Sequence, residues 1–155
     1  MDIEILGQGF EPLSKNSVGN VLIEYFSNQD FHSFTAISAF TTLSGIKGIS
    51  NLISESSHLK KNLVVVGVNE KVTSKEALEE LLKIKNLKSY VFYGNNNSIF
   101  HPKIYLFEGI KHSILIIGSS NLTGRGLFTN VETSILISID NTIEKDKKII
   151  EQLKD

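Results

Sequence analysis

The chain has 155 residues, of which 41% are hydrophobic and 21% are charged, and its formal net charge is -1 at pH 7. This size and composition are typical of a soluble globular protein with one core, and they exclude a uniformly basic nucleic-acid coat. The absence of cysteine excludes disulfides, thiolate–zinc sites and a cysteine nucleophile, while the lack of a long apolar run or a secretion signal predicts a cytoplasmic protein with no membrane partner.

From the N-terminus onward, hydrophobic periodicity predicts alternating helices and strands, followed by several strands in close succession. Helices are expected at 17–26, 42–57, 75–85 and 143–155, and strands at 34–40, 62–68, 89–94, 101–108, 113–118 and 131–139, with a loop at 95–98 and a turn at 109–112. This order favours an α/β fold with a central mixed β-sheet flanked by helices. The absence of a repeat or linker favours one domain over residues 1–155.

The expected strand HPKIYLFE, residues 101–108, contains two polar residues in an apolar run. Alternate side chains of a strand share a face, so His101 and Lys103 lie side by side, and Glu108 faces the other way. A charged group is costly to bury unless it is paired or functional. Either this is an edge strand, which tolerates Pro102 and lets the lysine reach water, or the two residues form part of a site.

The next expected strand, 113–118, runs directly into a turn of small polar residues. Ser119 and Asn121 are again two positions apart, so they face the same way if the backbone stays extended. A histidine, a fixed cation and neutral hydrogen-bond donors together suit a phosphodiester, because they supply a group that titrates near neutral pH and partners for phosphoryl oxygens. Ser-Ser-Asn is also ordinary turn chemistry, which leaves a purely structural interpretation open.

Together these two stretches resemble the HKD signature of the phospholipase D superfamily, which is His-x-Lys-x4-Asp followed by Gly-Ser/Gly-x-Asn. The matching positions are His101, Lys103, Gly118, Ser119 and Asn121. The signature aspartate is replaced by Glu108, which we expect to support the structure without a catalytic role. The resemblance implies a phospholipase D-like fold and a histidine nucleophile that forms a phosphohistidine.

The resemblance also implies further parts of the site. In single-motif nucleases of this superfamily an acidic residue hydrogen-bonds the histidine, and Glu132 matches its place. Members use two such histidines, whereas this chain has one copy of the motif. We therefore expect a homodimer in which His101 of each subunit enters a shared site. No cofactor and no metal are expected, because the lysines supply the positive charge.

We therefore expect a metal-independent endonuclease that cleaves DNA, similar to the catalytic domains of some restriction endonucleases, with a recognition or helicase domain outside this chain as a further possibility. Basic residues outnumber acidic ones between residues 58 and 125, and Arg125 and Lys111 flank the motif as candidate phosphate contacts. Two alternatives remain open. One is a non-catalytic nucleic-acid-binding or recruitment module, and the other is a phosphodiesterase acting on lipid or another small substrate.

Overall fold

The structure is a computed structural model that describes residues 1–9, 16–94 and 98–154. Its strands are β1 (Asp2–Gln8), β2 (Phe31–Ser38), β3 (Lys61–Gly67), β4 (Leu87–Phe92), β5 (Lys103–Gly109), β6 (His112–Gly118) and β7 (Glu132–Asp140). Its helices are α1 (Val18–Ser27), α2 (Leu43–Glu55), α3 (Lys75–Leu81), α4 (Gly124–Phe128) and α5 (Glu144–Lys154), with a 3-10 turn η1 (Asn69–Lys71). The predicted α/β class is confirmed.

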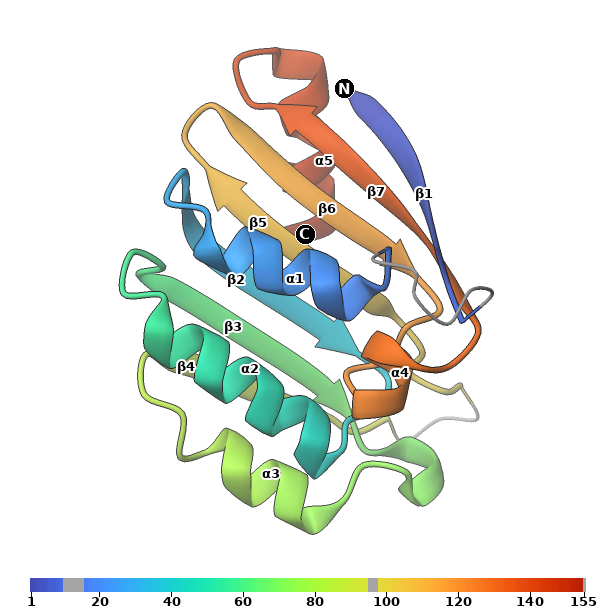
Figure 1. Cartoon of the computed structure of the whole chain (residues 1–155). Helices are drawn as coiled ribbons and strands as arrows, with labels where there is room; N and C mark the ends of the chain where they lie inside the picture. The colour runs from blue at the N-terminus through green and yellow to red at the C-terminus, as the bar shows by residue number, and fades with distance from the viewer. Residues whose placement is uncertain (10–15, 95–97, 155) are drawn as a thin grey trace.

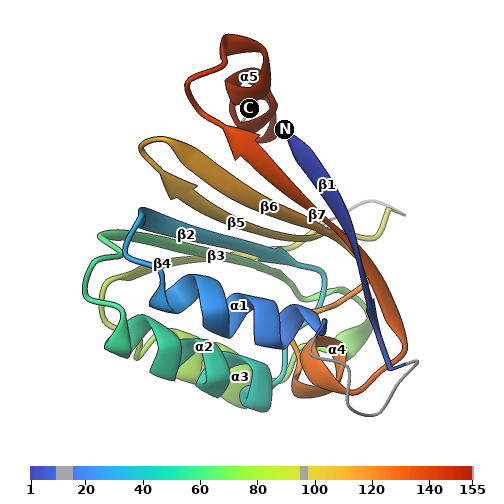
Figure 2. The same ribbon diagram turned by 45° about the horizontal axis from the view of Figure 1, so that its top comes forward.

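The described strands form one mixed sheet in the order β1-β7-β6-β5-β2-β3-β4. Helices α1, α2 and α3 cover one face, and α5 lies behind the other (Figures 1 and 2). The larger core lies under the first three helices, where the rings of Phe26, Phe34 and Phe107 are in mutual contact. A smaller core lies under α5 and contains Leu106, Leu115, Ile139 and Ile150.

Each of the helices α1 to α4 begins after a hydroxyl side chain that accepts a backbone N–H of the first turn. The capping residues are Ser17, Thr42, Ser74 and Thr123. Such caps satisfy N–H groups that have no partner inside the helix, and so they determine where the helix starts. The start of α3 agrees with the sequence prediction, but the helix ends at Leu81, well before the predicted residue 85.

Three elements were not predicted from the sequence: β1, α4 and the 3-10 turn η1. The edge strand β1 pairs antiparallel with β7, and the short helix α4 follows the Gly-Ser-Ser-Asn turn. His101 was expected inside a strand, but β5 begins only at Lys103. Residues 95–97 of the predicted loop lie outside the described residues.

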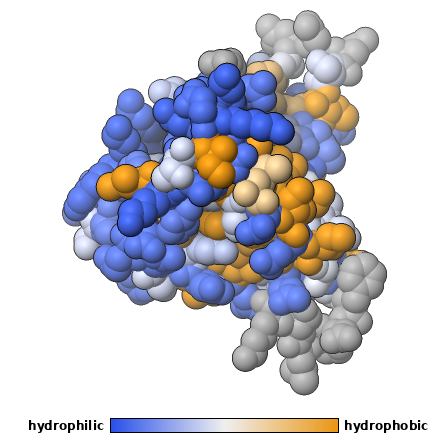
Figure 3. Space-filling model, turned by 90° about the horizontal axis from the view of Figure 1, so that it is seen from above, coloured by the Kyte–Doolittle hydropathy of each residue, from blue (hydrophilic) through white to orange (hydrophobic). Residues whose placement is uncertain are grey.

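The sheet leaves part of its second face uncovered by α5. The strand registers place one row of residues across this face: Ile5, Ile135, Ile117, Ile104, Ile37, Val65 and Tyr90. Ile5 is 76% exposed, and Ile135 and Ile117 are also exposed. Figure 3, which shows the molecule from above, displays hydrophobic surface gathered in the middle and right of the view.

Strand order and direction bring several strand ends to one edge of the sheet. Ser38 at the end of β2 pairs with Lys103 at the start of β5, because these strands are antiparallel. The end of β6 and the start of β7 reach the same edge, where Gly118 pairs with Ser134. The motif residues, which are distant in sequence, are therefore collected by the topology of the sheet.

Two loops at this edge are joined through Leu122. Its N–H donates to Ser38 Oγ at 2.9 Å, and its carbonyl oxygen accepts from Thr41 Oγ1 at 2.8 Å. Helix α2 approaches the same carbonyl so closely that a Cβ added at Gly45 would lie 2.2 Å from it. The first turn of α2 is thus packed directly on the loop that follows Ser119 and Asn121.

This packing predicts opposite effects of two alanine substitutions within α2. Gly45→Ala should lower the free energy of unfolding by about 1–3 kcal/mol, because the new methyl group overpacks the Leu122 backbone. Gly48→Ala, where an added Cβ meets nothing within 4 Å, should raise it by up to about 1 kcal/mol through helix propensity. Urea unfolding measures both, and equal effects would contradict the close packing at Gly45.

Candidate active site

The candidate site lies at the edge of the sheet where the strand ends meet. A cavity of about 460 Å³ opens there, and its lining includes Phe40, Asn121, Arg125, Asn130 and Glu132. Most of the lining comes from the loops after β2 and β6, from α4 and from the segment that leads into β7. This placement agrees with the general rule that binding groups are displayed on loops held by a rigid scaffold.

His101 and Lys103 are in direct contact, as their spacing predicts. Lys103 Nζ lies 2.6 Å from Nδ1 and 3.0 Å from Nε2 of the exposed imidazole, and it donates to the His101 carbonyl oxygen at 2.9 Å. The imidazole also meets the ring of Phe40 edge-on, with centroids 5.7 Å apart. Which ring nitrogen accepts from the ammonium depends on the tautomer of the imidazole.

Lys103 is only 6% exposed, so its charge is held in a poorly solvated position. Burial lowers the pKa of its ammonium group below the usual 10.5, and the nearby carboxylate of Glu132 acts in the opposite direction. Beneath it, the fully buried Tyr105 donates to the Ser120 carbonyl oxygen at 2.9 Å. Burial, helped by Glu132, raises the pKa of this phenol above its usual range, so Tyr105 stays neutral.

Glu132 is bound to Ser119, and this differs from the predicted bond to His101. The Ser119 hydroxyl donates to one carboxylate oxygen of Glu132, and Asn130 Nδ2 donates to the other at 3.2 Å. Strand β6 lies between β5 and β7, which are therefore roughly 10 Å apart. The serine at the end of the intervening strand is thus the partner that Glu132 binds in the described residues, and a bond between Glu132 and His101 stays a prediction.

The remaining predicted residues fall in two places. Asn121 lines the cavity, and its side-chain oxygen accepts the Phe40 N–H at 3.2 Å, which leaves its amide N–H₂ as the available donor. Arg125 lines the same cavity. Lys111, however, lies in the turn between β5 and β6, at the opposite end of β5 from Lys103. That is roughly 20 Å away, so the structure does not bring Lys111 to the site.

Glu108 also lies at the far end of β5, where it accepts hydrogen bonds from Ser33 Oγ and Lys154 Nζ. It therefore links the sheet to α5, in agreement with its predicted structural role.

Sequence reasoning missed one residue that supports this site. Gln8, at the end of β1, is 2% exposed and uses both ends of its amide. Its Nε2 donates to the carbonyl oxygens of Gly126 and Asn130, and its Oε1 accepts the Val18 N–H. Gln8 thus joins α1, α4 and the segment before Glu132. The alternation of polar and apolar residues in DIEILGQ was the available signal for this strand.

The site combines the imidazole and ammonium of His101 and Lys103 with the amide of Asn121, which lines the cavity together with Phe40, the ring that His101 contacts. Within residues 1–9, 16–94 and 98–154, no three His, Asp or Glu side chains cluster as metal ligands would. The cationic group at this edge beside the imidazole is the ammonium of Lys103. Such an arrangement can bind a phosphate group and place a ring nitrogen beside it.

Several known proteins are similar to this chain. A family model described as "Cardiolipin synthase, PLD-like domain" matches residues 20–154. The structure resembles NucT from Helicobacter pylori, with a TM-score of 0.67 and 19% identity over 99% of this chain and 93% of that one. It also resembles Nuc, a phospholipase D family member from Salmonella typhimurium, with a TM-score of 0.60 and 16% identity over 99% and 92% of the two chains.

A third similar structure is yeast tyrosyl-DNA phosphodiesterase, with a TM-score of 0.60 and 8% identity. The match covers 90% of this chain and 32% of the yeast protein. No curated protein sequence matches the chain. At these identities the structural matches establish a common fold.

The position of Lys103 predicts how its charge responds to pH. In an NMR titration of the Lys103 side chain, the pKa should lie below 10.5, because burial disfavours the ammonium. In Glu132→Gln the pKa should fall further, because the carboxylate that stabilises the positive charge is removed. A wild-type pKa at or above 10.5, or an increase in the variant, would contradict the described environment.

Proposed function

Because the chain belongs to the phospholipase D superfamily, we propose that it is a phosphodiesterase that cleaves DNA through a phosphohistidine formed on His101. The observation that carries this proposal is the contact between the exposed imidazole of His101 and the buried ammonium of Lys103. A lysine in this position binds the phosphate beside the ring nitrogen that attacks it. The charge is already in place when the substrate arrives, so little reorganisation is needed during the reaction.

In the first step, a ring nitrogen of His101 attacks phosphorus, a P–N bond forms, and the bond between phosphorus and the leaving oxygen breaks. Lys103 stabilises the negative charge on the phosphoryl oxygens, and the amide of Asn121 donates to them. A second histidine gives its proton to the leaving oxygen. In the second step that histidine takes a proton from water, and the resulting hydroxide attacks phosphorus and releases His101.

We assign Glu132 a positioning role in this mechanism. Its carboxylate holds the hydroxyl of Ser119, and its charge favours the ammonium form of Lys103. Ser119 is then oriented at the edge of the cavity, where its oxygen can interact with substrate. Arg125, which lines the cavity, is the proposed contact for a neighbouring phosphate. Lys111 is left out of this set because of its distance from the site.

The second histidine is proposed to be His101 of the partner subunit, in a symmetric homodimer. His-x-Lys occurs twice in the chain, at residues 58–60 and 101–103, but only the second copy is followed by Gly-Ser-x-Asn, so the chain has one complete motif, whereas the mechanism needs two histidines. A two-fold axis beside the site would bring the same residue of both subunits to one phosphate. Exposed apolar residues at the cavity support this arrangement: Val72, which lines it, is 47% exposed, and Val131, between the lining residues Asn130 and Glu132, is 63% exposed. Isolated subunits seldom keep such residues in water beside a site without a use for them.

DNA is the proposed substrate, and two alternatives follow from the same site. The name of the yeast relative, a tyrosyl-DNA phosphodiesterase, supports a DNA phosphodiester. A nucleic-acid-binding module without catalysis and a phosphodiesterase of lipid or another small substrate remain the alternatives. No helix of the described residues is long and apolar enough to cross a membrane.

Plasmid cleavage in EDTA tests the proposal. The wild type should convert supercoiled plasmid to nicked and linear forms without divalent metal, because Lys103 supplies the positive charge. His101→Ala should lower the rate by at least about 10³-fold, since the nucleophile is removed. The matched control is His32→Ala, which removes an exposed histidine at the start of β2 and should cleave as the wild type does.

Three results would contradict the proposal. Equal nicking by the wild type and His101→Ala would point to a contaminating nuclease. A strict requirement for divalent metal would rule out the lysine-based mechanism. Hydrolysis of an aryl phosphodiester without cleavage of DNA would favour the small-substrate alternative.

A further inference from the structure

The strand at the β4 edge of the sheet presents a lysine and two aromatic residues on the face opposite α1, α2 and α3. Lys88, Tyr90 and Phe92 alternate along β4 and therefore share this face. Tyr90 is 58% exposed and Phe92 is 45% exposed. Large aromatic side chains at a free sheet edge expose apolar surface and an unpaired strand, which proteins generally avoid unless the surface has a use.

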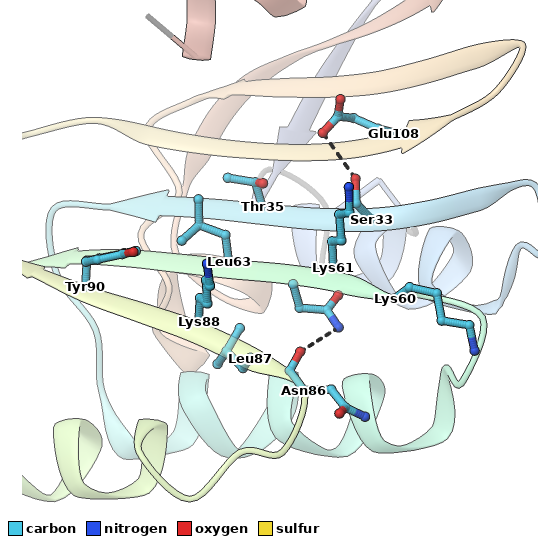
Figure 4. A pocket seen from close by; sticks show the side chains of 11 residues that line it. Ser33, Thr35, Lys60, Lys61, Leu63, Asn86, Leu87, Lys88, Tyr90 and Glu108 are labelled. Atoms are coloured by element: carbon cyan, nitrogen blue, oxygen red, sulfur yellow. Dashed lines mark hydrogen bonds between the residues drawn. The ribbon is translucent and has the colours of Figure 1, made fainter.

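A cavity of about 690 Å³ lies beside this strand. Lys61 and Lys88 stand on the same side of the sheet as Thr35 and Leu63, and the ring of Tyr90 lies at the other end of the group (Figure 4). Glu108 is the acidic residue of the lining, and it is already bound to Ser33 and Lys154.

The positive charge of this cavity is not neutralised from within the molecule. In the part of the chain that the structure describes, neither Lys61 nor Lys88 has an ion-pair partner. Lys60, a third lysine at the cavity, donates to the Ser57 carbonyl oxygen at 2.7 Å. An uncompensated pair of ammonium groups over an open cavity favours an anionic ligand.

An aromatic contact connects the end of β4 with the residue that precedes His101. The ring of Phe92 stacks on that of Phe100, with centroids 4.5 Å apart and an interplanar angle of 18°. Phe100 immediately precedes His101 in the sequence. From Lys88 to Phe92 the strand covers roughly 13 Å. A linear ligand lying along β4 would thus reach from the lysines to the edge that carries His101.

We propose that Lys61, Lys88, Tyr90 and Phe92, here called the β4 track, bind a single-stranded segment of the polynucleotide that is cleaved at His101. The inference rests on the proposed function and adds to it a preference for unpaired strands. Lysines bind backbone phosphates, whereas exposed aromatic rings stack on base faces, which are accessible only when the bases are not stacked within a duplex. The lysines and the rings together therefore fit a single strand better than a duplex.

Binding is measured in the non-cleaving His101→Ala background by fluorescence anisotropy, with a labelled 20-nucleotide oligothymidylate and a blunt 20-base-pair duplex as probes. With the β4 track unsubstituted, the protein should bind the single-stranded probe more tightly than the duplex. Tyr90→Ala should weaken binding of the single strand by about tenfold, because one ring that stacks on a base is removed, and should change duplex binding little. Leu82→Ala, which removes a 78% exposed apolar side chain elsewhere, is the matched control and should bind as the background protein does.

The lysines are tested by the salt dependence of the same binding. Lys61→Ala combined with Lys88→Ala should reduce the slope of log affinity against log salt by about 1.4, roughly 0.7 for each single-strand phosphate that the variant no longer neutralises. The paired control is Lys47→Ala with Lys145→Ala, which removes exposed lysines of α2 and α5 and should leave the slope nearly unchanged. Circular dichroism of every variant verifies that the fold is retained.

The inference is overturned if Tyr90→Ala binds the single strand as tightly as Leu82→Ala does, or if it weakens single-strand and duplex binding equally. A change in oligomeric state with unchanged DNA affinity would also overturn it, and would assign the β4 edge to a protein partner. Plasmid cleavage by the wild type separates the two proposals. If the wild type cleaves DNA while the track variants bind normally, only the β4 track is wrong.

Discussion

The ammonium of Lys103 at the first position of an apolar strand is the constraint on which the site depends. Removing a charged group from water is costly unless its surroundings compensate it. Here the charge is held by the carbonyl and imidazole of His101, with the carboxylate of Glu132 close enough to favour it. This partial compensation leaves an ammonium that is fixed in place and still able to attract a phosphate. A solvated lysine would offer the same charge without the same position.

The fold holds this lysine in place from several directions. Strand pairing puts Ser38 beside it, and Ser38 in turn binds the loop that contains Asn121. Gln8 holds a second part of the site, because its buried amide donates to the carbonyl oxygens of Gly126 and Asn130 in the segment that leads to Glu132. Most of these bonds involve backbone atoms. The geometry of the site is therefore determined mainly by the backbone of the sheet and its loops, which positions the polar side chains.

The hydrophobic periodicity of the sequence was sufficient to predict the core elements. The spacing of two residues was sufficient to predict the contact between His101 and Lys103, because alternation along an extended chain is a local property. Local patterns could not give the distances between strands. Lys111 is close to the motif in sequence, but a hairpin turn carries it to the far end of β5. Glu132 was expected to bind His101, whereas β6 lies between β7 and β5, and Ser119 at the end of β6 is the group that Glu132 binds. Such differences arise from the order of strands, which periodicity does not specify.

The central claim is that two copies of His101 act on one phosphate, and a purified mixed dimer tests it most directly. Wild-type and His101→Ala chains carrying different affinity tags are co-expressed, the mixed species is isolated, and its rate of DNA cleavage in EDTA is compared with that of the wild-type dimer. A shared site predicts almost no turnover by the mixed dimer, because its single copy of His101 has no partner to protonate the leaving oxygen. A rate near half that of the wild type would show that each subunit has a complete site, and would contradict the account.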